Sequence, residues 1–292
     1  MATSRTPLFD PDEPTAREGH ALKAEADDEV VGAPPEPDVV ASRALMIAAL
    51  CERARLESNK DLMRFTQLSK WVERYGLYGN LGEEGVELFD SELGTWNEED
   101  LDTVSWATEE LQVLLWSLQR AELPGLETRT DVQELMITLP LMRDAESFLE
   151  QSGLRALDEV ETMLALHEAL LEAIRSEVYA RSILEDPNAL EPDPELDELL
   201  SAIESRGFDR ATAAKGGKAA EAIAGLRFWC RSVLAELFAD ASPHVGYRLD
   251  AARLSSLDDA SLATILGTAQ ARTDALAWLV EGDEEVDAPP PE

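Results

Sequence analysis

The stretch that decides the fold is Trp106-Ala107-Thr108-Glu109-Glu110-Leu111-Gln112-Val113-Leu114-Leu115-Trp116-Ser117-Leu118. At about 100° per residue, a helix places the two tryptophans on one face together with Glu109 and Val113. Its other side carries four leucines, which are Leu111, Leu114, Leu115 and Leu118. A helix that is apolar on both sides is buried on both sides. The segment therefore predicts the central helix of the fold.

Glu109 is the exception on the tryptophan face, because it is charged. A buried carboxylate needs a cation or hydrogen-bond donors, or it is held in its neutral form. One interpretation is a structural Glu paired with an Arg from a neighbouring helix. The other is a functional carboxylate in a Trp-lined region that binds a ligand or exchanges a proton. The candidate cluster is Trp106, Glu109 and Trp116, with Arg43 and Arg272 as candidate counter-charges.

The rest of the chain has helical periodicity almost throughout, and no strand-length alternating segment is present. Asn97 is the expected N-cap of the central helix, which ends before Pro124 and Gly125. The other expected helices span residues 39–57, 62–75, 154–184, 195–205, 216 or 218 to 238, and 257–280. The pattern predicts an all-α protein, an irregular multi-helix bundle around the two-faced apolar helix.

Composition divides the chain into three parts. Residues 1–38 and 281–292 are acidic and rich in proline, so we expect disordered tails. A helical domain is expected over residues 39–280, with a sub-boundary at 185–195, where Pro187, Pro192 and Pro194 gather.

The formal net charge of the chain is -35. The tails hold sixteen of the sixty acids and three of the twenty-five bases, which leaves a net charge of -22 in residues 39–280. A field of this sign repels nucleic acid and anionic membranes. It favours a basic protein partner, or it serves only to keep the protein soluble. The oligomeric state stays open.

Two further features bear on the compartment. The chain shows neither a signal-peptide h-region nor an apolar run long enough to span a membrane, so a cytoplasmic location is expected. Cys51 and Cys230 lie among apolar neighbours in expected helices. They are typical of small buried residues in a reducing compartment.

The residues also resemble a known family. Trp106-x-x-Glu109-x-Leu111-x-Val113-Leu114-Leu115-Trp116-x-Leu118 is similar to the central signature of the bacterial family named domain of unknown function 4272. Three other stretches resemble it in order: Arg43-Ala44-Leu45, Tyr75-Gly76-Leu77 followed by Leu81-Gly82-Glu83-Glu84, and Arg272-x-x-Ala275-Leu276-x-Trp278-Leu279. The resemblance spans about residues 40–280. It implies a helical fold and a bacterial source, and no activity.

The departures from that family concern polar positions. Thr273 stands where members tend to place a His, and His167 is not followed by the arginines that they tend to carry. If the family's polar cluster performs chemistry, the resemblance implies that this member lacks parts of it.

Other motifs give weak signals. His167 lies on an apolar face, without a second ligand at metal spacing, which indicates a core histidine. The glycines at 76, 79, 82 and 85 lack the Lys and Ser/Thr of a phosphate loop, and a helix–helix connection is expected there. Lys215-Gly216-Gly217-Lys218 lacks the nucleotide pattern and is interpreted as a helix-initiating loop. No catalytic, metal or cofactor site is predicted.

Three functional hypotheses follow. The leading one is a non-enzymatic, cytoplasmic protein-interaction protein, of the adaptor or immunity type, with an acidic surface. The second is an enzyme or small-ligand binder that uses Glu109 in the Trp-lined region. The third is a DNA mimic.

Overall fold

The computed structural model of the chain describes residues 33–187, 194–240 and 251–282. The described residues all belong to one compact unit. The expected tails fall largely outside the described residues. The first helix begins at Pro37, inside the segment that was expected to be a tail.

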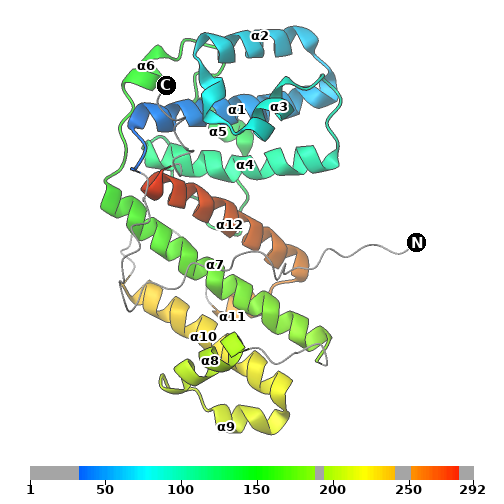
Figure 1. Cartoon of the computed structure of the whole chain (residues 1–292), viewed down its shortest axis with the longest axis vertical. Coiled ribbons are helices and arrows are strands. Elements are labelled where there is room, and N and C mark those ends of the chain that lie inside the picture. Colours follow the sequence, from blue (N-terminus) through cyan, green and yellow to red (C-terminus); the bar gives the residue numbers. More distant parts are fainter. Residues whose placement is uncertain (1–32, 188–193, 241–250, 283–292) are drawn as a thin grey trace, which may run out of the picture. The chain divides into compact units, whose positions relative to one another are not determined.

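The described residues form helices and no strand, which confirms the all-α prediction (Figure 1). The α-helices are α1 (Pro37–Asn59), α2 (Leu62–Arg74), α3 (Glu83–Asp90), α4 (Glu98–Ser117), α5 (Val132–Thr138), α6 (Glu146–Glu150), α7 (Leu157–Glu185), α8 (Pro194–Glu204), α9 (Arg210–Ala213), α10 (Lys218–Asp240), α11 (Ala251–Ser256) and α12 (Asp259–Glu281). Two 3-10 helices, η1 (Leu77–Asn80) and η2 (Ala214–Gly216), lie between them.

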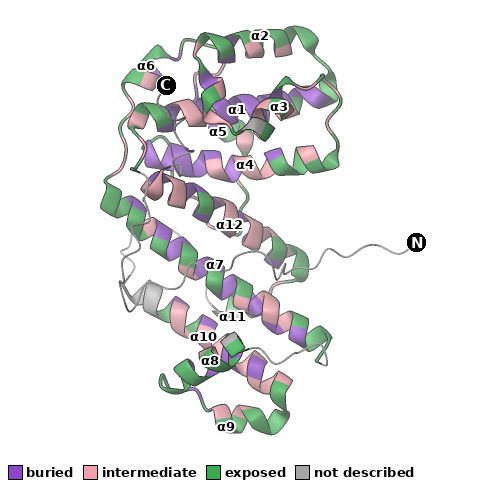
Figure 2. Cartoon of the chain, viewed as in Figure 1, coloured by how far each residue is buried: buried purple, intermediate pink, exposed green. Residues whose placement is uncertain are grey.

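Helix α4 is the centre of the bundle, as the apolar pattern predicts. It packs against α1 on one side and α12 on the other, and residues 111–118 are all buried (Figure 2). Its start follows from a capping box. The Asn97 side chain accepts hydrogen bonds from the backbone N–H groups of Glu99 and Asp100, and the Asp100 carboxylate accepts one from Asn97 N at 2.8 Å.

The helices follow one another through shared apolar clusters. Beyond α12 lies α7, and α10 packs on α7 in turn. One cluster joins α1, α4 and the C-terminal part of α12, and a second joins the middle of α7 with α10 and α12. A third joins the end of α7 with α8 and α10, so residues on both sides of the 185–195 segment share one cluster.

The glycine-rich segment after α2 was expected to be a helix–helix connection, but it contains two helical elements. Gly76 has φ +64°, a left-handed conformation that ends α2 at little steric cost because glycine has no Cβ. The 3-10 helix η1 and helix α3 follow directly. The short helices α3, α5, α6, α9 and α11 were not predicted from the sequence.

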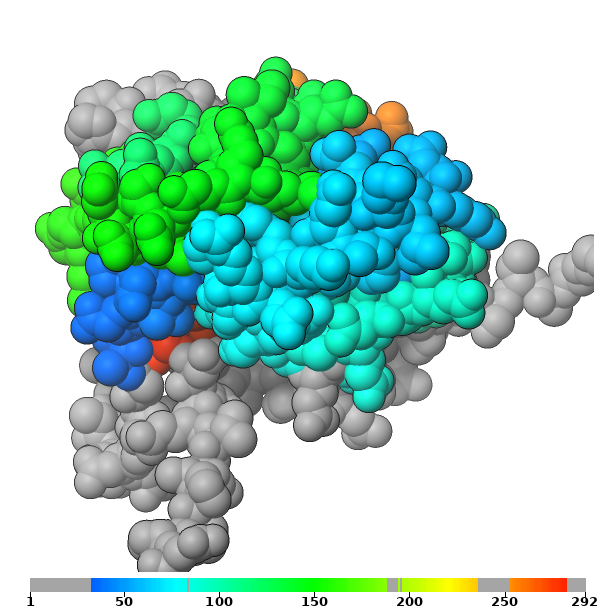
Figure 3. Space-filling view, turned by 90° about the horizontal axis from the view of Figure 1, so that it is seen from above, coloured from blue at the N-terminus to red at the C-terminus, as the bar shows by residue number. Residues whose placement is uncertain are grey.

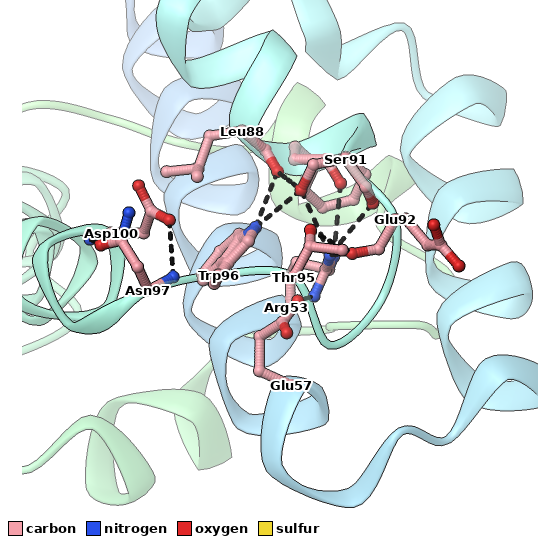
Figure 4. Close-up of polar contacts among 10 residues, drawn as sticks. Arg53, Glu57, Leu88, Ser91, Glu92, Thr95, Trp96, Asn97 and Asp100 are labelled. Atoms are coloured by element: carbon pink, nitrogen blue, oxygen red, sulfur yellow. Dashed lines mark hydrogen bonds and ion pairs between the residues drawn. The ribbon is translucent and has the colours of Figure 1, made fainter.

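Arg53 of α1 fixes the end of α3 through hydrogen bonds to its backbone. Arg53 is fully buried, and its guanidinium donates hydrogen bonds to the backbone oxygens of Phe89 (3.3 Å) and Ser91 (3.1 Å). It also forms an ion pair with Glu57 and stacks on the ring of Trp96, 4.7 Å from the centroid (Figure 4). One side chain thus fixes the loop that leads from α3 into α4.

Candidate functional site

Glu109 lies on the face of α4 that meets α12, and its partner is Arg272. Arg272 donates to Glu109 Oε2 from Nε at 3.0 Å and from Nη2 at 2.8 Å. Both side chains are completely buried. The two residues are 163 positions apart in the sequence, so this ion pair joins the central helix to the last helix.

The other hydrogen bonds of Glu109 and Arg272 are made with the segment that follows α4. Thr130 donates twice to Glu109, from its backbone N to Oε1 at 2.8 Å and from its hydroxyl to Oε2 at 2.9 Å. Arg272 Nη1 donates to the backbone oxygen of Pro124. Four donors therefore surround the carboxylate, which compensates for its removal from water.

Arg43, the other candidate counter-charge, has a different partner. Its Nε donates to Glu110, the next residue of α4, at 2.6 Å, and both side chains are about one quarter exposed. The guanidinium also lies 4.3 Å from the ring centroid of Trp278 on α12. Arg43 thus connects α1, α4 and α12, and its ion-pair partner on α4 is Glu110.

The two tryptophans do not line a common pocket. The Trp106 ring lies directly over Gly267 of α12, and Arg129 stacks on it at 4.2 Å. Trp116 lies near the end of α4, where Arg155 stacks on its ring at 4.9 Å and donates to its carbonyl oxygen at 2.9 Å. Ten residues separate the rings, about 15 Å along a helix. Trp106 therefore packs with Arg129 against α12, whereas Trp116 packs with Arg155 near the end of α4.

A histidine and a threonine complete the buried polar surroundings of Arg272. His167 of α7 is fully buried, as expected of a core histidine, and its Nδ1 lies 3.0 Å from the backbone oxygen of Met163. Burial and, to a lesser extent, the charge of Arg272 lower the pKa of His167 to about 4. Thr268, one turn before Arg272, has a buried hydroxyl without a hydrogen-bond partner. A neutral imidazole is the form that fits beside a buried guanidinium.

This geometry gives Glu109 little room for chemistry. Its carboxylate is not exposed, and the donors on it belong to the protein itself. Breaking such a buried pair leaves an uncompensated charge, which typically costs about 3–5 kcal/mol. The arrangement suits a contact that fixes α12 on α4.

A second buried carboxylate was not found from the sequence. Glu177 of α7 accepts from Arg227 of α10 at 2.8 Å and from Arg181 at 3.3 Å. Arg181 also forms an ion pair with Asp259 at the start of α12, with 2.7 Å between Nη1 and Oδ1. The sequence signal was the apolar surroundings of Glu177 on α7, which resemble those of Glu109.

One stretch of the chain carries many acids and no basic residue. Residues 75–119 contain eleven acids and no Lys, Arg or His. Glu109 and Glu110 are paired inward, whereas eight others with described side chains form the acidic segment and have no ion pair with any described residue. These are Glu84, Glu87, Asp90, Glu92, Glu98, Glu99, Asp100 and Asp102. All are exposed except Asp100, which is half-buried.

No group of three or more His, Cys, Asp or Glu side chains among the described residues is arranged to hold a metal ion. None of the described helices combines the length and apolar character required to cross a membrane.

Fold and site together define a helical protein whose central helix is tied to the closing helix by a buried Glu–Arg pair. The family model described as Domain of unknown function (DUF4272) matches residues 19–190. The chain belongs to this family. The match ends just after α7, so α12 and Arg272, expected within the resemblance, lie outside the matched residues. Comparison with curated proteins and with solved structures gives no match.

Proposed function

We propose that this protein is a non-enzymatic, cytoplasmic interaction protein, of the adaptor or immunity type, that binds a basic protein partner through its acidic segment. The observation that carries the proposal is the acidic segment from Glu84 to Asp102, in which seven of the eight acids are exposed and none has an ion pair with a described residue. Carboxylates that are not neutralised within the fold project a negative field, and such a field accelerates encounter with positive surfaces.

The buried pair supports the same view. A functional Glu109 would have to leave Arg272 and the Thr130 donors before it could bind a ligand. The acidic segment needs no such rearrangement, because its side chains already face solvent.

The test compares two variants with equal charge. The first neutralises the acidic segment with Glu84→Gln, Glu87→Gln, Glu92→Gln and Asp102→Asn. The control neutralises four exposed acids of α7 and α8, which are Glu161, Glu172, Glu198 and Glu204, with Gln at each. Immobilised wild type captures proteins from the lysate of the source cell, and the captured partner is then purified and titrated with both variants.

We expect a basic partner that dissociates as salt is raised. At about 0.4 kcal/mol per exposed charge pair, the first variant binds it about tenfold more weakly. The control binds nearly as well as wild type. Equal binding by the two variants, or a captured partner without a basic surface, would refute the proposal. Competition between the partner and double-stranded DNA for the acidic segment would identify a DNA mimic instead.

A further inference from the structure

An open groove of about 490 Å³ lies between α2 and the segment formed by η1 and α3. Figure 3 views the molecule from the side on which these elements adjoin, with α2 in sky blue and α3 in cyan. The lining residues are Thr66, Ser69, Lys70, Glu73, Tyr78, Val86 and Asp90. All of them lie within the residues that the family model matches.

Aromatic rings beneath the groove give it a fixed shape. The ring of Phe89 packs against Phe65 at 5.9 Å and edge-on against Tyr78 at 5.8 Å. Arg53 supports this layer from the core, because its guanidinium lies 4.6 Å from the centroid of the Phe65 ring. It also donates hydrogen bonds to the backbone oxygens of Ser91 and Glu92, just after α3 (Figure 4). The groove therefore exists before any partner arrives.

Two carboxylates, those of Glu73 and Asp90, line the groove together with Tyr78. Tyr78 donates to Asp90 Oδ1 at 3.0 Å. Burial, the hydrogen bond to Asp90 and the charges of Asp90 and Glu73 together raise the pKa of Tyr78 to about 12. The phenol thus keeps its proton and continues to donate, while Asp90 Oδ2 has no donor among the described residues. Glu73 is exposed and has no ion pair there.

One lysine also lines the groove, on the same helix as Glu73. Lys70 is exposed and carries its charge on a flexible stem. The two acids of the lining outnumber it.

We propose that this groove receives an arginine or lysine side chain of the basic partner. The stem of the guest packs on Val86 and the ring of Tyr78, and its charged head lies between Glu73 and Asp90. A cation over an aromatic face and beside two carboxylates gains from both. This inference rests on the proposed function and names the place where the acidic segment makes its specific contact.

The test uses the blocked peptide acetyl-Gly-Arg-Gly-Arg-Gly-amide and the full chain labelled at valine methyl groups. On titration at low salt, the Val86 methyl resonances shift, and those of Val178 on α7 do not. The double variant Glu73→Gln/Asp90→Asn raises the Kd about three- to tenfold, from the loss of two partly exposed charge contacts. The control Glu198→Gln/Glu204→Gln, with the same change in charge, raises it less than about twofold. Lys70→Gln lowers it, because a like charge is removed.

Each of three other outcomes would contradict the proposed docking of a basic side chain in the groove. If both double variants weaken the peptide equally, total charge holds it, and the proposed function stands without a groove. If the peptide shifts no methyl near the groove, the inference fails, and capture from lysate decides the proposed function separately. If free guanidinium or spermidine shifts Val86 at the concentration of the peptide, the groove is a small-cation site and not a docking site.

Discussion

The exchange of Glu109 for glutamine perturbs the buried pair most directly. The substitution keeps the size of the side chain and removes its charge, so Arg272 is left as an uncompensated cation in a site without solvent exposure. The new amide has one oxygen and one NH2 group, so in either orientation a donor of Thr130 or Arg272 faces an N–H group instead of an acceptor. Breaking one partner of such a pair costs about 3–5 kcal/mol, a large share of the roughly 5–15 kcal/mol that stabilises an ordinary domain.

The assay is urea unfolding of the full chain, followed by far-UV circular dichroism. With a slope of about 2–3 kcal/mol per M, the midpoint of Glu109→Gln falls by roughly 1–2 M. Glu110→Gln is the matched control, since its ion pair with Arg43 is partly exposed and contributes less than about 1 kcal/mol. The double variant Glu109→Leu/Arg272→Met recovers most of the loss, because no charge stays buried. Equal midpoints for the two single glutamine variants would refute the reasoning.

Three other substitutions test the surrounding structure. The pKa of His167 is about 4 in the fold against an ordinary 6.5, so the unfolded chain binds more protons between these values. Stability therefore falls by roughly 3 kcal/mol from pH 7 to below pH 4, and His167→Leu should remove that part of the pH slope in urea titrations. Arg53→Met leaves Glu57 without its partner and frees the α3–α4 loop, so we expect a loss of about 3 kcal/mol or more and faster cleavage of that loop by a Glu-specific protease. Gly267→Ala should destabilise the fold although alanine favours helix by about 1 kcal/mol, because the new Cβ would lie 2.5 Å from the Trp106 ring; in a Trp106→Leu background the same change should stabilise.

The sequence was sufficient to predict the helical class and the centre of the bundle. Leucines and tryptophans on opposite sides of one segment require burial from two directions, and α1 and α12 supply it. Glu109 on that helix indicated a counter-charge, and Arg272 was one of two arginines considered.

The choice between Arg43 and Arg272 could not be made from periodicity. It depends on which face of α4 each neighbouring helix covers, and this is set by packing between segments far apart in the chain. Thr130 was missed because a threonine in a loop has no pattern, although it donates two hydrogen bonds to Glu109.

Helix α3 was missed for a related reason. An eight-residue helix with glycine inside and before it has little intrinsic stability. It depends on Arg53, whose i,i+4 spacing to Glu57 is typical of an exposed surface pair. In the fold that arginine is fully buried and bonds the backbone at the end of α3. The groove above it was therefore outside the reach of sequence reasoning.

One measurement separates a structural Glu109 from a functional one. The captured basic partner is titrated with two folded variants, Glu109→Leu/Arg272→Met and the four-residue neutralisation of the acidic segment. We predict that the first binds like wild type, because it removes only a contact inside the core, and that the second binds about tenfold more weakly. Loss of binding by the first with retention by the second would contradict this account and place the function at the buried carboxylate.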